Sequence, residues 1–488
     1  MSVAPAARTR SPSPGALSRL PATELIAGYR ARAFSPSDVI EEVIAALEAT
    51  DAVCNVMVTP MFDTARAEAA AATKAWRSGT PAGALTGVPV TIKDLIYVAG
   101  VPAKGGAPVL RDFVPQADAA VVSALRRAGA ILTCKTTTCE SGYKLTADSP
   151  VSGITRNPWN PGRTSGGSSG GAAAAIAAGC GPLAVGTDGV GSIRVPASFC
   201  GVFGIKPTFG LVPRAPGFFP PSWASLAHTG PIARTVADAA LLLETIAGHD
   251  LRDAASLPLG VRRFDTTPGK LNGLRIAYTP DFGFAAVAPD VRHAFSAALD
   301  VLTDLGAELF NDDVGLDPDV LEHTAKPIAY TEQAGAVVGR NTEQLALSDA
   351  EYQDVIARGR LYGGAEYIDA MHRRTRVRGQ FVGLFDRADI LVTPTVAVTA
   401  FDAGTLGTDQ IDGRAVDRHL GWSPFSWPIN LAGAPAATIP CGFDRDGLPI
   451  GLQIVAPWLE EAVIFRVAAA LEAALALSGR WPDLAASR

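Results

Sequence analysis

The spacing of apolar residues over the first 80 positions predicts two helices. Ser35 and Pro36 form a typical helix start, because serine caps the first N–H groups and proline is tolerated at the first helical position. From Ile40 to Leu47, apolar residues then recur at the spacing of one helix face. An alanine-rich segment predicts a second helix over about residues 61–76. We interpret both helices as packing elements without chemistry.

Helix and strand patterns then alternate as far as about residue 210. The β-branched residues 88–92 predict a buried strand that ends at Lys93. A helical pattern over residues 121–130 precedes a strand pattern over residues 131–134. Such alternation favours a layered α/β core. A lysine at the end of a buried strand, taken alone, usually buries its stem and extends its ammonium group to solvent.

A segment rich in proline and aromatic residues, 211–226 (LVPRAPGFFPPSWASL), interrupts this alternation. It predicts a loop that either packs on the core or forms an apolar wall of a substrate pocket. The candidate pocket residues are Tyr143, Phe218, Phe219 and Trp223.

The second half of the chain returns to regular elements. Thr235 is typical of a helix N-cap, with Asp238 three residues later and the helix body extending to Ile246. Residues 317–385 are helix-rich and more charged, and we interpret them as a substrate-side cap in which the basic run 371–378 forms a solvated helix face. Further elements are predicted as strand–helix–strand over 270–312, strands at 388–394 and 437–442, and a helix over 462–474. We find no internal repeat.

Composition narrows the class of protein. The 488 residues are 48% hydrophobic and 18% charged, which is enough to bury a large core. A net charge of −6 argues against nucleic acid or an anionic membrane as partner. The six cysteines are scattered in a way that fits neither a disulfide framework nor a zinc site, which predicts a reducing, cytoplasmic setting. Residues 1–16 are expected to be disordered and lack the apolar segment of a signal peptide, and no apolar run is long enough to span a bilayer.

The stretch from Arg163 to Pro196 has the most distinctive pattern. Two glycine-wrapped serine clusters, residues 166–171 (GGSSGG) and 189–192 (GVGS), flank an alanine-rich run. Glycine permits positive φ and lets a ligand approach main-chain N–H groups. Two serines held by such loops at the ends of one compact unit indicate a built site.

Three other interpretations of the first cluster are weaker. A flexible linker would not run directly into an apolar segment that has to be packed. A phosphate-binding loop of the Walker type requires a lysine after the glycines, and none follows. Residues 166–170 satisfy G-x-S-x-G, but a nucleophile elbow requires a preceding strand and an upstream HGGG-type loop. Residues 155–164 instead predict a loop, and no HGGG segment is present.

The whole stretch resembles the signature of the amidase signature family of serine hydrolases. The resemblance extends over roughly residues 20–475 and is carried by several motifs together. The further segments that carry it are 85–94 (LTGVPVTIKD), 155–164 (TRNPWNPGRT), 200–208 (CGVFGIKPT), 230–238 (GPIARTVAD), 430–436 (NLAGAPA) and 447–453 (GLPIGLQ).

This resemblance implies an α/β fold with one large domain over residues 17–488. Its central mixed β-sheet is expected to carry helices on both faces, with the helices of residues 17–80 packed on the core and residues 317–385 as the cap. The disordered lead-in would occupy residues 1–16.

The resemblance also implies a Ser-Ser-Lys arrangement. Ser192 would be the nucleophile, and Ser168, which in the family follows a cis peptide bond, would pass its proton to neutral Lys93. Because the ordinary pKa of lysine is near 10.4, burial would have to stabilise the neutral amine. The implied oxyanion donors are the N–H groups of Gly189, Val190, Gly191 and Ser192. The implied supporting residues are Ser169, Asp188 and Arg194, the last two as a possible pair.

A Ser-His-Asp triad has less support. None of the six histidines occurs in a motif beside either serine. His228 is nearest, and its neighbours favour a turn. The Ser-Ser-Lys arrangement needs no histidine.

Two positions depart from the family pattern. Val190 replaces the first of two glycines that generally precede the nucleophile. A β-branched residue at positive φ would be costly and would distort the oxyanion hole, whereas at negative φ it would simply narrow the pocket. Ser165 replaces a common proline, which leaves the serine assignment intact but would loosen the loop.

These observations predict a metal-free serine amidohydrolase that uses no cofactor. Its expected partner is a small, neutral and fairly apolar amide or carbamate, with esters as side substrates, and we expect a monomer or homodimer. One alternative is the glutaminase subunit of a tRNA-dependent amidotransferase, which would need further subunits. Another is a catalytically silent family member with a purely binding role, an alternative that only Val190 favours.

Overall fold

The computed structural model describes residues 16–217, 225–260 and 262–484. An eleven-stranded sheet forms its centre, in the order β1-β3-β2-β8-β10-β9-β16-β17-β13-β11-β12. The strands are β1 (Met57–Pro60), β2 (Pro89–Lys93), β3 (Ile131–Thr136), β8 (Leu183–Asp188), β9 (Phe203–Lys206), β10 (His228–Ala233), β11 (Arg275–Tyr278), β12 (Glu308–Asn311), β13 (Ile390–Pro394), β16 (Ala436–Phe443) and β17 (Pro449–Val455).

The sheet is mixed, as expected. Strand β2 runs parallel to β3 on one side and to β8 on the other. The central strands from β8 to β13 pair antiparallel, and β13, β11 and β12 are again parallel. Because β2 and β8 are parallel neighbours, their carboxyl ends lie at the same edge of the sheet.

Helices cover both faces of the sheet, which confirms the predicted α/β class. Helices α5 and α6 contact each other on one face, and α7 and α14 contact each other on the other. The helices are α1 (Ala22–Ala31), α2 (Pro36–Cys54), α3 (Phe62–Ser78), α4 (Ala120–Arg127), α5 (Gly170–Ala178), α6 (Arg194–Cys200), α7 (Val236–Ile246), α8 (Pro289–Asp304), α9 (Lys326–Ala336), α10 (Thr342–Ala346), α11 (Ala350–Gly359), α12 (Gly364–Phe385), α13 (Trp427–Ala432) and α14 (Glu461–Leu475).

Helix α5 explains the composition of the stretch between the two serine clusters. All nine of its residues are buried, and it contacts α2 as well as β2, β3, β8 and β10. A Cβ added at Gly171 would lie 2.3 Å from Thr137 Oγ1 and 2.5 Å from the carbonyl oxygen of Val56. Small residues are therefore required here because the helix is packed against neighbours on all sides.

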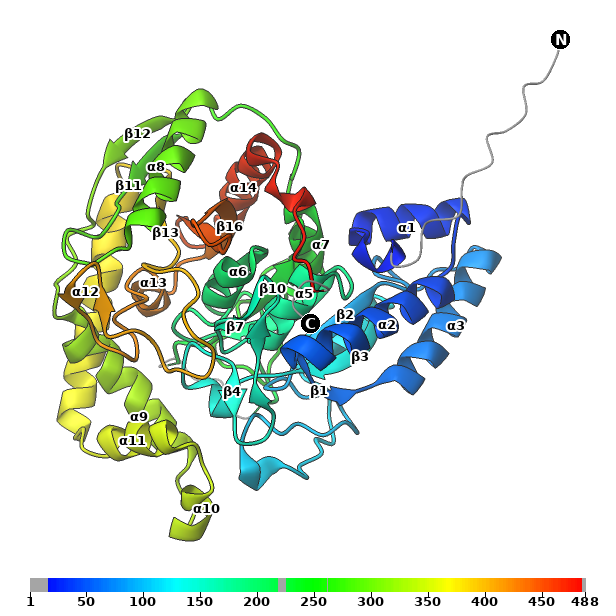
Figure 1. Cartoon of the computed structure of the whole chain (residues 1–488), viewed down its shortest axis with the longest axis horizontal. Helices are drawn as coiled ribbons and strands as arrows, with labels where there is room; N and C mark the ends of the chain where they lie inside the picture. The colour runs from blue at the N-terminus through cyan, green and yellow to red at the C-terminus, as the bar shows by residue number, and fades with distance from the viewer. Residues whose placement is uncertain (1–15, 218–224, 261, 485–488) are drawn as a thin grey trace.

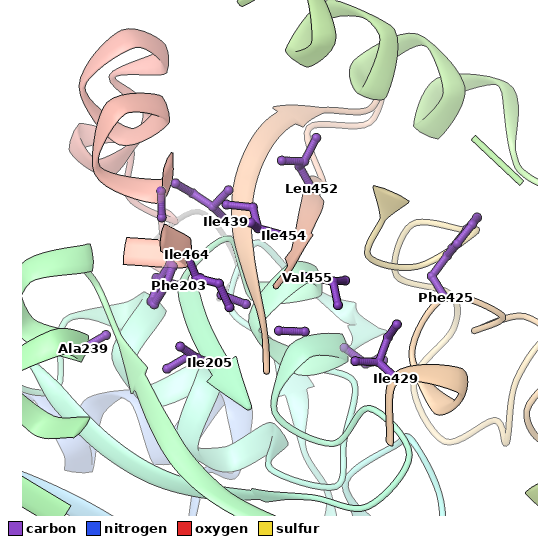
Figure 2. Close-up of a cluster of buried hydrophobic side chains, with 14 of the residues drawn as sticks. Phe203, Ile205, Ala239, Phe425, Ile429, Ile439, Leu452, Ile454, Val455 and Ile464 are labelled. Carbon is purple, nitrogen blue, oxygen red and sulfur yellow. The ribbon is translucent and has the colours of Figure 1, made fainter. Parts of the chain in front are cut away.

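The larger buried apolar cluster includes α7 and α14 on the other face of the sheet, and it also takes in Val195 and Phe199 of α6. Figure 2 shows part of it, where Ile439, Leu452 and Ile454 of β16 and β17 gather with Ile464 of α14 and Phe203 of β9. Each of these side chains is at most 3% exposed. This packing fixes the strands whose ends support the site described below.

The two predicted helix caps are confirmed. Ser35 accepts a hydrogen bond from the backbone N–H of Asp38 and, with that residue, forms a capping box at the start of α2. Thr235 accepts one from the backbone N–H of Asp238 at the start of α7. Local side-chain chemistry therefore determined both helix starts.

Two local predictions are wrong. Residues 155–164 are not only loop, because β6 (Arg156–Asn157) and β7 (Asn160–Thr164) pair as a short hairpin. His228 does not lie in a turn but begins β10, opposite Asp188 of β8. In both cases backbone pairing with a partner strand outweighs the residue preferences for turns.

The basic run 371–378 on α12 is also only partly a solvated face. Arg374 Nε donates to the carbonyl of Leu431 at 2.9 Å, and Arg378 Nη1 donates to that of Ala432 at 2.9 Å. These carbonyls lie at the C-terminal end of α13, where cations are favoured by the helix dipole. The run therefore fastens α12 to α13.

Several predictions concern the ends and surroundings of the fold. Apart from Ala16, the expected lead-in of residues 1–16 lies outside the described residues. Helices α1 to α3 pack beside the core, and α9 to α12 form the helix-rich region expected at residues 317–385, with α10 projecting from it (Figure 1). Among the helices in the described part of the chain, none combines the length and apolar character that crossing a bilayer requires.

Candidate active site

The parallel pairing of β2 and β8 brings the predicted base next to the serine loops. Lys93 is the last residue of β2, and the register pairs the preceding Ile92 with Val185 of β8. Ser168 and Ser169 come directly before α5, which packs on these same strands. The backbone N–H of Ser169 donates to the carbonyl of Ser192 at 3.1 Å, which joins the two serine loops.

The amine of Lys93 lies among neutral hydroxyl groups. Its Nζ is 2.7 Å from Ser168 Oγ, 2.9 Å from Ser169 Oγ and 2.8 Å from Thr187 Oγ1. The side chain is fully buried, and within the described chain no carboxylate lies within ion-pair distance of it. Burial therefore lowers the pKa of Lys93 to about 7. A substantial fraction of the amine is neutral at physiological pH and able to accept a proton.

Ser168 and Ser192 line the same cavity. The peptide bond between Gly167 and Ser168 is cis, as the resemblance implies. Ser168 Oγ is engaged with Lys93, whereas Ser192 Oγ has no hydrogen-bond partner among the residues that the structure describes. The hydroxyl of Ser192 is therefore available to a bound ligand.

The loop from Gly189 to Ser192 is organised by Asp188. The N–H of Gly191 donates to Asp188 Oδ1 at 2.8 Å, and the N–H of Ile193 donates to Oδ2 at 3.2 Å. The N–H of Gly191 is thus already engaged within the protein. In the described structure, the N–H groups of Gly189, Val190 and Ser192 have no protein acceptor. Three of the four expected oxyanion donors therefore remain free.

Asp188 and Arg194 form the expected pair, and both are fully buried. Arg194 Nε donates to Asp188 Oδ2 at 3.0 Å, and Nη2 donates to Oδ1 at 3.1 Å. Asn430 and Gln453 accept further hydrogen bonds from this guanidinium at 2.5 and 2.7 Å. Although burial alone would raise the pKa of Asp188, the charge and hydrogen bonds of Arg194 hold it below its ordinary value. The carboxylate that shapes the loop is therefore permanently charged.

Val190 does not strain the loop. Its φ is negative, whereas the neighbouring Gly191 has φ +132°. The carbonyl of Val190 accepts a hydrogen bond from Ser426 Oγ at 2.6 Å, and its side chain lines the cavity. From the sequence, Val190 was expected either to distort the oxyanion hole or to narrow the pocket. The observed geometry corresponds to the second case, a narrower pocket with an undistorted loop.

The cavity above the serines has a volume of about 320 Å³. Tyr143 lines it, as predicted. Phe218, Phe219 and Trp223 lie outside the described residues. The two ends of their loop nevertheless line the cavity, through Arg214, Pro216 and Gly217 at one end and Ser225, Leu226 and Ala227 at the other. The helix-rich region contributes Ala329, Tyr330, Glu332, Gln333, Gly335, Ala336 and Val355 to the wall.

His228 does not contribute to this constellation. Its Nδ1 lies 2.8 Å from the carbonyl of Leu226, and its Nε2 lies 3.3 Å from Lys206 Nζ. Burial and the neighbouring charge of Lys206 lower the pKa of His228 well below its usual value. The ring is a buried neutral group behind Asp188 rather than a partner of either serine.

Several residues of the site received no role from the sequence. Thr187 binds the Lys93 amine, and Asn430 and Gln453 hold Arg194. Asn430 and Gln453 stand in motifs that carry the resemblance, so these motifs were the available signal. Tyr330 and His419 also line the cavity, yet each lies in a segment without a recognisable motif.

Comparison with known proteins agrees with this geometry. A family model described as Amidase matches residues 38–465. The chain is 36% identical over 479 residues to an acylamidase from Rhodococcus erythropolis, covering 93% of this chain and 95% of that protein. It is 35% identical over 475 residues to a glutamyl-tRNA(Gln) amidotransferase subunit from Synechococcus sp. (strain RCC307), covering 91% of this chain and 95% of that protein.

The same likeness appears in three dimensions. The crystal structure of a bacterial aryl acylamidase of the amidase signature enzymes superimposes with a TM-score of 0.86. The two sequences are 30% identical, and the alignment covers 93% of this chain and 96% of the other. The fold is therefore shared along almost the entire chain.

Proposed function

The chain belongs to the amidase family, and from this premise we propose that it hydrolyses carboxamides through an acyl-enzyme on Ser192. Ser168 and Lys93 would carry the proton. The observation that supports this most directly is the 2.7 Å contact between Lys93 Nζ and Ser168 Oγ at a cavity that Ser192 also lines.

The proton path follows from the chemistry of these groups. Neutral Lys93 accepts the proton of Ser168, and Ser168 accepts that of Ser192 as the latter attacks the carbonyl carbon. The path then reverses, so that Ser168 donates a proton to the departing nitrogen. Water subsequently attacks the acyl-enzyme by the same path. Lys93 can serve in both directions because burial places its pKa at about 7.

The free N–H groups of Gly189, Val190 and Ser192 are the proposed oxyanion donors. They belong to a loop whose shape the buried pair of Asp188 and Arg194 maintains. Donors fixed in this way need no rearrangement when charge develops on the oxygen, and losing one typically costs about 10²–10³-fold in kcat.

We propose neutral, fairly apolar amides as substrates, with aryl carbamates and esters as further substrates. Much of the cavity wall consists of aliphatic, aromatic and small residues. The charged side chains Arg214 and Glu332 also line it, and each lies in the electrostatic field of the other. Burial raises the pKa of Glu332 to about 7, so its carboxyl group is readily neutralised, and where it is ionised its charge opposes that of Arg214. Neither a strongly anionic nor a strongly cationic substrate is therefore proposed.

A second candidate is glutaminase activity within an amidotransferase. Its support is the similarity to the glutamyl-tRNA(Gln) amidotransferase subunit from Synechococcus over 91% of this chain. Such activity would require glutamine as substrate and partner proteins for full turnover.

The test is hydrolysis of a p-nitroanilide, an aryl carbamate and glutamine by the wild type, Ser192→Ala and Lys93→Ala. We expect turnover of the anilide or carbamate and a loss of about 10⁴-fold or more in each variant. Ser152→Ala is the matched control, since Ser152 pairs with Ser149 away from the cavity. Activity on glutamine alone would favour the second candidate. A folded wild type that turns over none of the three, and whose Ser192 resists a fluorophosphonate label, would contradict the hydrolase and favour a silent binding protein.

A further inference from the structure

Three residues of the cavity lining are joined to one another by two hydrogen bonds. Tyr330 Oη lies 2.6 Å from Nδ1 of His419, and Nε2 of His419 lies 3.3 Å from the carbonyl oxygen of Tyr143. All three residues line the cavity that contains Ser192. Neither bond has a part in the proton path proposed above.

The direction of both hydrogen bonds is fixed by chemistry. A backbone carbonyl can only accept, so Nε2 of His419 must carry the hydrogen. Burial lowers the pKa of His419 to about 4, so the ring is neutral and its Nδ1 is an acceptor. The hydroxyl of Tyr330 is therefore the donor to Nδ1. Burial also raises the pKa of Tyr330, so this phenol keeps its proton.

The two rings are held firmly in place. Asp417 Oδ1 accepts hydrogen bonds from the backbone N–H groups of His419 and Leu420, and Asp417 itself pairs with Lys326 at 2.7 Å. The guanidinium of Arg358 lies 5.0 Å from the centre of the Tyr330 ring. Tyr330 is only 1% exposed. Its hydroxyl therefore cannot simply rotate to donate elsewhere without breaking the bond to His419.

A phenol that already donates its one hydrogen to an acceptor can make further hydrogen bonds only by accepting them at its oxygen. On the premise of the proposed hydrolase, we propose that Tyr330 is a specificity-determining residue that accepts a hydrogen bond from an N–H group of the substrate. The substrates favoured by this wall are amides and carbamates that carry such an N–H. An oxygen at the same position, as in an ester, would meet the lone pairs of Tyr330 and be disfavoured.

The test compares substrates that differ only by an N–H group. The first pair is a p-nitroanilide and the p-nitrophenyl ester of the same acyl group, which differ at the scissile bond. The second pair is two p-nitroanilides whose acyl chains carry an amide N–H or its N-methyl form. We expect Tyr330→Phe to lower kcat/KM about tenfold for the N–H member of at least one pair and not to lower it for the partner substrate without the N–H.

The matched control is Tyr352→Phe. Tyr352 is fully buried and packs against Tyr143, with the two ring centroids 4.9 Å apart, but its hydroxyl donates to Gln333 Oε1 and does not contact His419. We expect this variant to change both members of each pair equally. A second variant, His419→Ala, removes the acceptor of the Tyr330 hydroxyl. It should reduce the preference for the substrate that carries the N–H group within the same pair.

The outcomes separate this inference from the proposed function. Suppose that Ser192→Ala abolishes turnover of every substrate, while folded Tyr330→Phe keeps the wild-type ratio of kcat/KM between the two members of each pair. The hydrolase then stands and the role of Tyr330 is refuted. If Tyr330→Phe and Tyr352→Phe lower all rates alike, the effect is structural and the inference also fails. Loss of discrimination in Tyr330→Phe alone, in either pair, supports it and identifies which N–H is bound.

Discussion

Lys93 Nζ and Ser168 Oγ lie 2.7 Å apart, and both side chains are almost completely shielded from bulk solvent. Burial lowers the pKa of Lys93 to about 7, and only the neutral amine can accept a proton. We therefore expect kcat/KM to be low at acidic pH, to rise through about pH 7 as the amine loses its proton, and to reach a plateau above it. A pH profile with a p-nitroanilide measures this.

Two controls belong to this profile. The first concerns the substrate: an anilide does not titrate in this range, so ionisation of the substrate cannot cause the inflection. Lys93→Ala should have a residual rate without the inflection near pH 7. An inflection near the ordinary lysine pKa of about 10.4 would contradict the buried, neutral base.

Two glycines of the oxyanion loop should differ sharply when replaced by alanine. A Cβ at Gly191 would lie 2.6 Å from Ser426 Oγ, and its φ of +132° is rarely adopted by other residues. A Cβ at Gly189 would meet nothing within 4 Å. We expect Gly191→Ala to lower kcat about 10²-fold or more by displacing the donors, and Gly189→Ala to have a much smaller effect. Equal losses in both variants would contradict this description of the loop.

Val190→Gly should change selectivity without activating the enzyme. Val190 has a negative φ, so the replacement relieves no backbone strain. Removing its side chain from the cavity wall should raise kcat/KM severalfold for bulky aryl acyl groups relative to acetyl. A series of p-nitroanilides with acyl groups of increasing size provides the measurement. An increase of the same size for every substrate would instead indicate that valine distorts the oxyanion hole.

The parts of the fold that sequence reasoning predicted depend on local chemistry. Ser35 and Thr235 cap their helices through side-chain bonds to residues three positions later, so the signal and its effect lie in one segment. The two serines and Lys93 were identified through a family resemblance, since their distances along the chain carry no physical signal of proximity. The parallel pairing of β2 and β8, together with the packing of α5 on these strands, brings the lysine to the serines.

The parts that sequence reasoning missed depend on packing between distant segments. Tyr330 and His419 meet across 89 positions of sequence, and neither lies in a motif. His228 was expected in a turn, but pairing with Asp188 places it in a strand. Arg374 was expected to face solvent, yet the end of α13 offers it a carbonyl acceptor. In each case a partner from elsewhere in the chain determines the conformation or the role.

Asp188→Asn should reduce stability as well as activity. The variant keeps the shape of the side chain but leaves Arg194 buried without its counter-charge. Breaking a buried pair in this way typically costs about 3–5 kcal/mol. We expect a large fall in the free energy of unfolding in urea and loss of anilide hydrolysis. Asp290→Asn is the control, because its pair with Arg445 is largely exposed and should change the unfolding midpoint little.

Lys144 should link the helix-rich region of residues 317–385, which we interpret as a cap, to the proposed active site. Its ammonium group lies 2.6 Å from Asp148 Oδ2 and 3.0 Å from Asp349 Oδ2, and it is 2% exposed. Asp349 caps α11, and the adjacent Tyr143 lines the cavity. Replacing Lys144 by methionine leaves these carboxylates without their common partner, so α11 should loosen. We expect KM to rise severalfold with a smaller change in kcat, because Ser168 and Ser192 are not displaced.

Hydrogen exchange distinguishes this role from general destabilisation. In Lys144→Met, amides of α11 should exchange faster while those of α5 remain protected, since α5 is buried within the core. Arg373→Met is the matched control on the cap, because its partner Asp369 lies on the same helix and the pair is partly exposed. It should leave KM and exchange of α11 unchanged. Faster exchange throughout the protein in Lys144→Met would mean that the residue stabilises the whole fold, and the cap would then not be a separate substrate-side element.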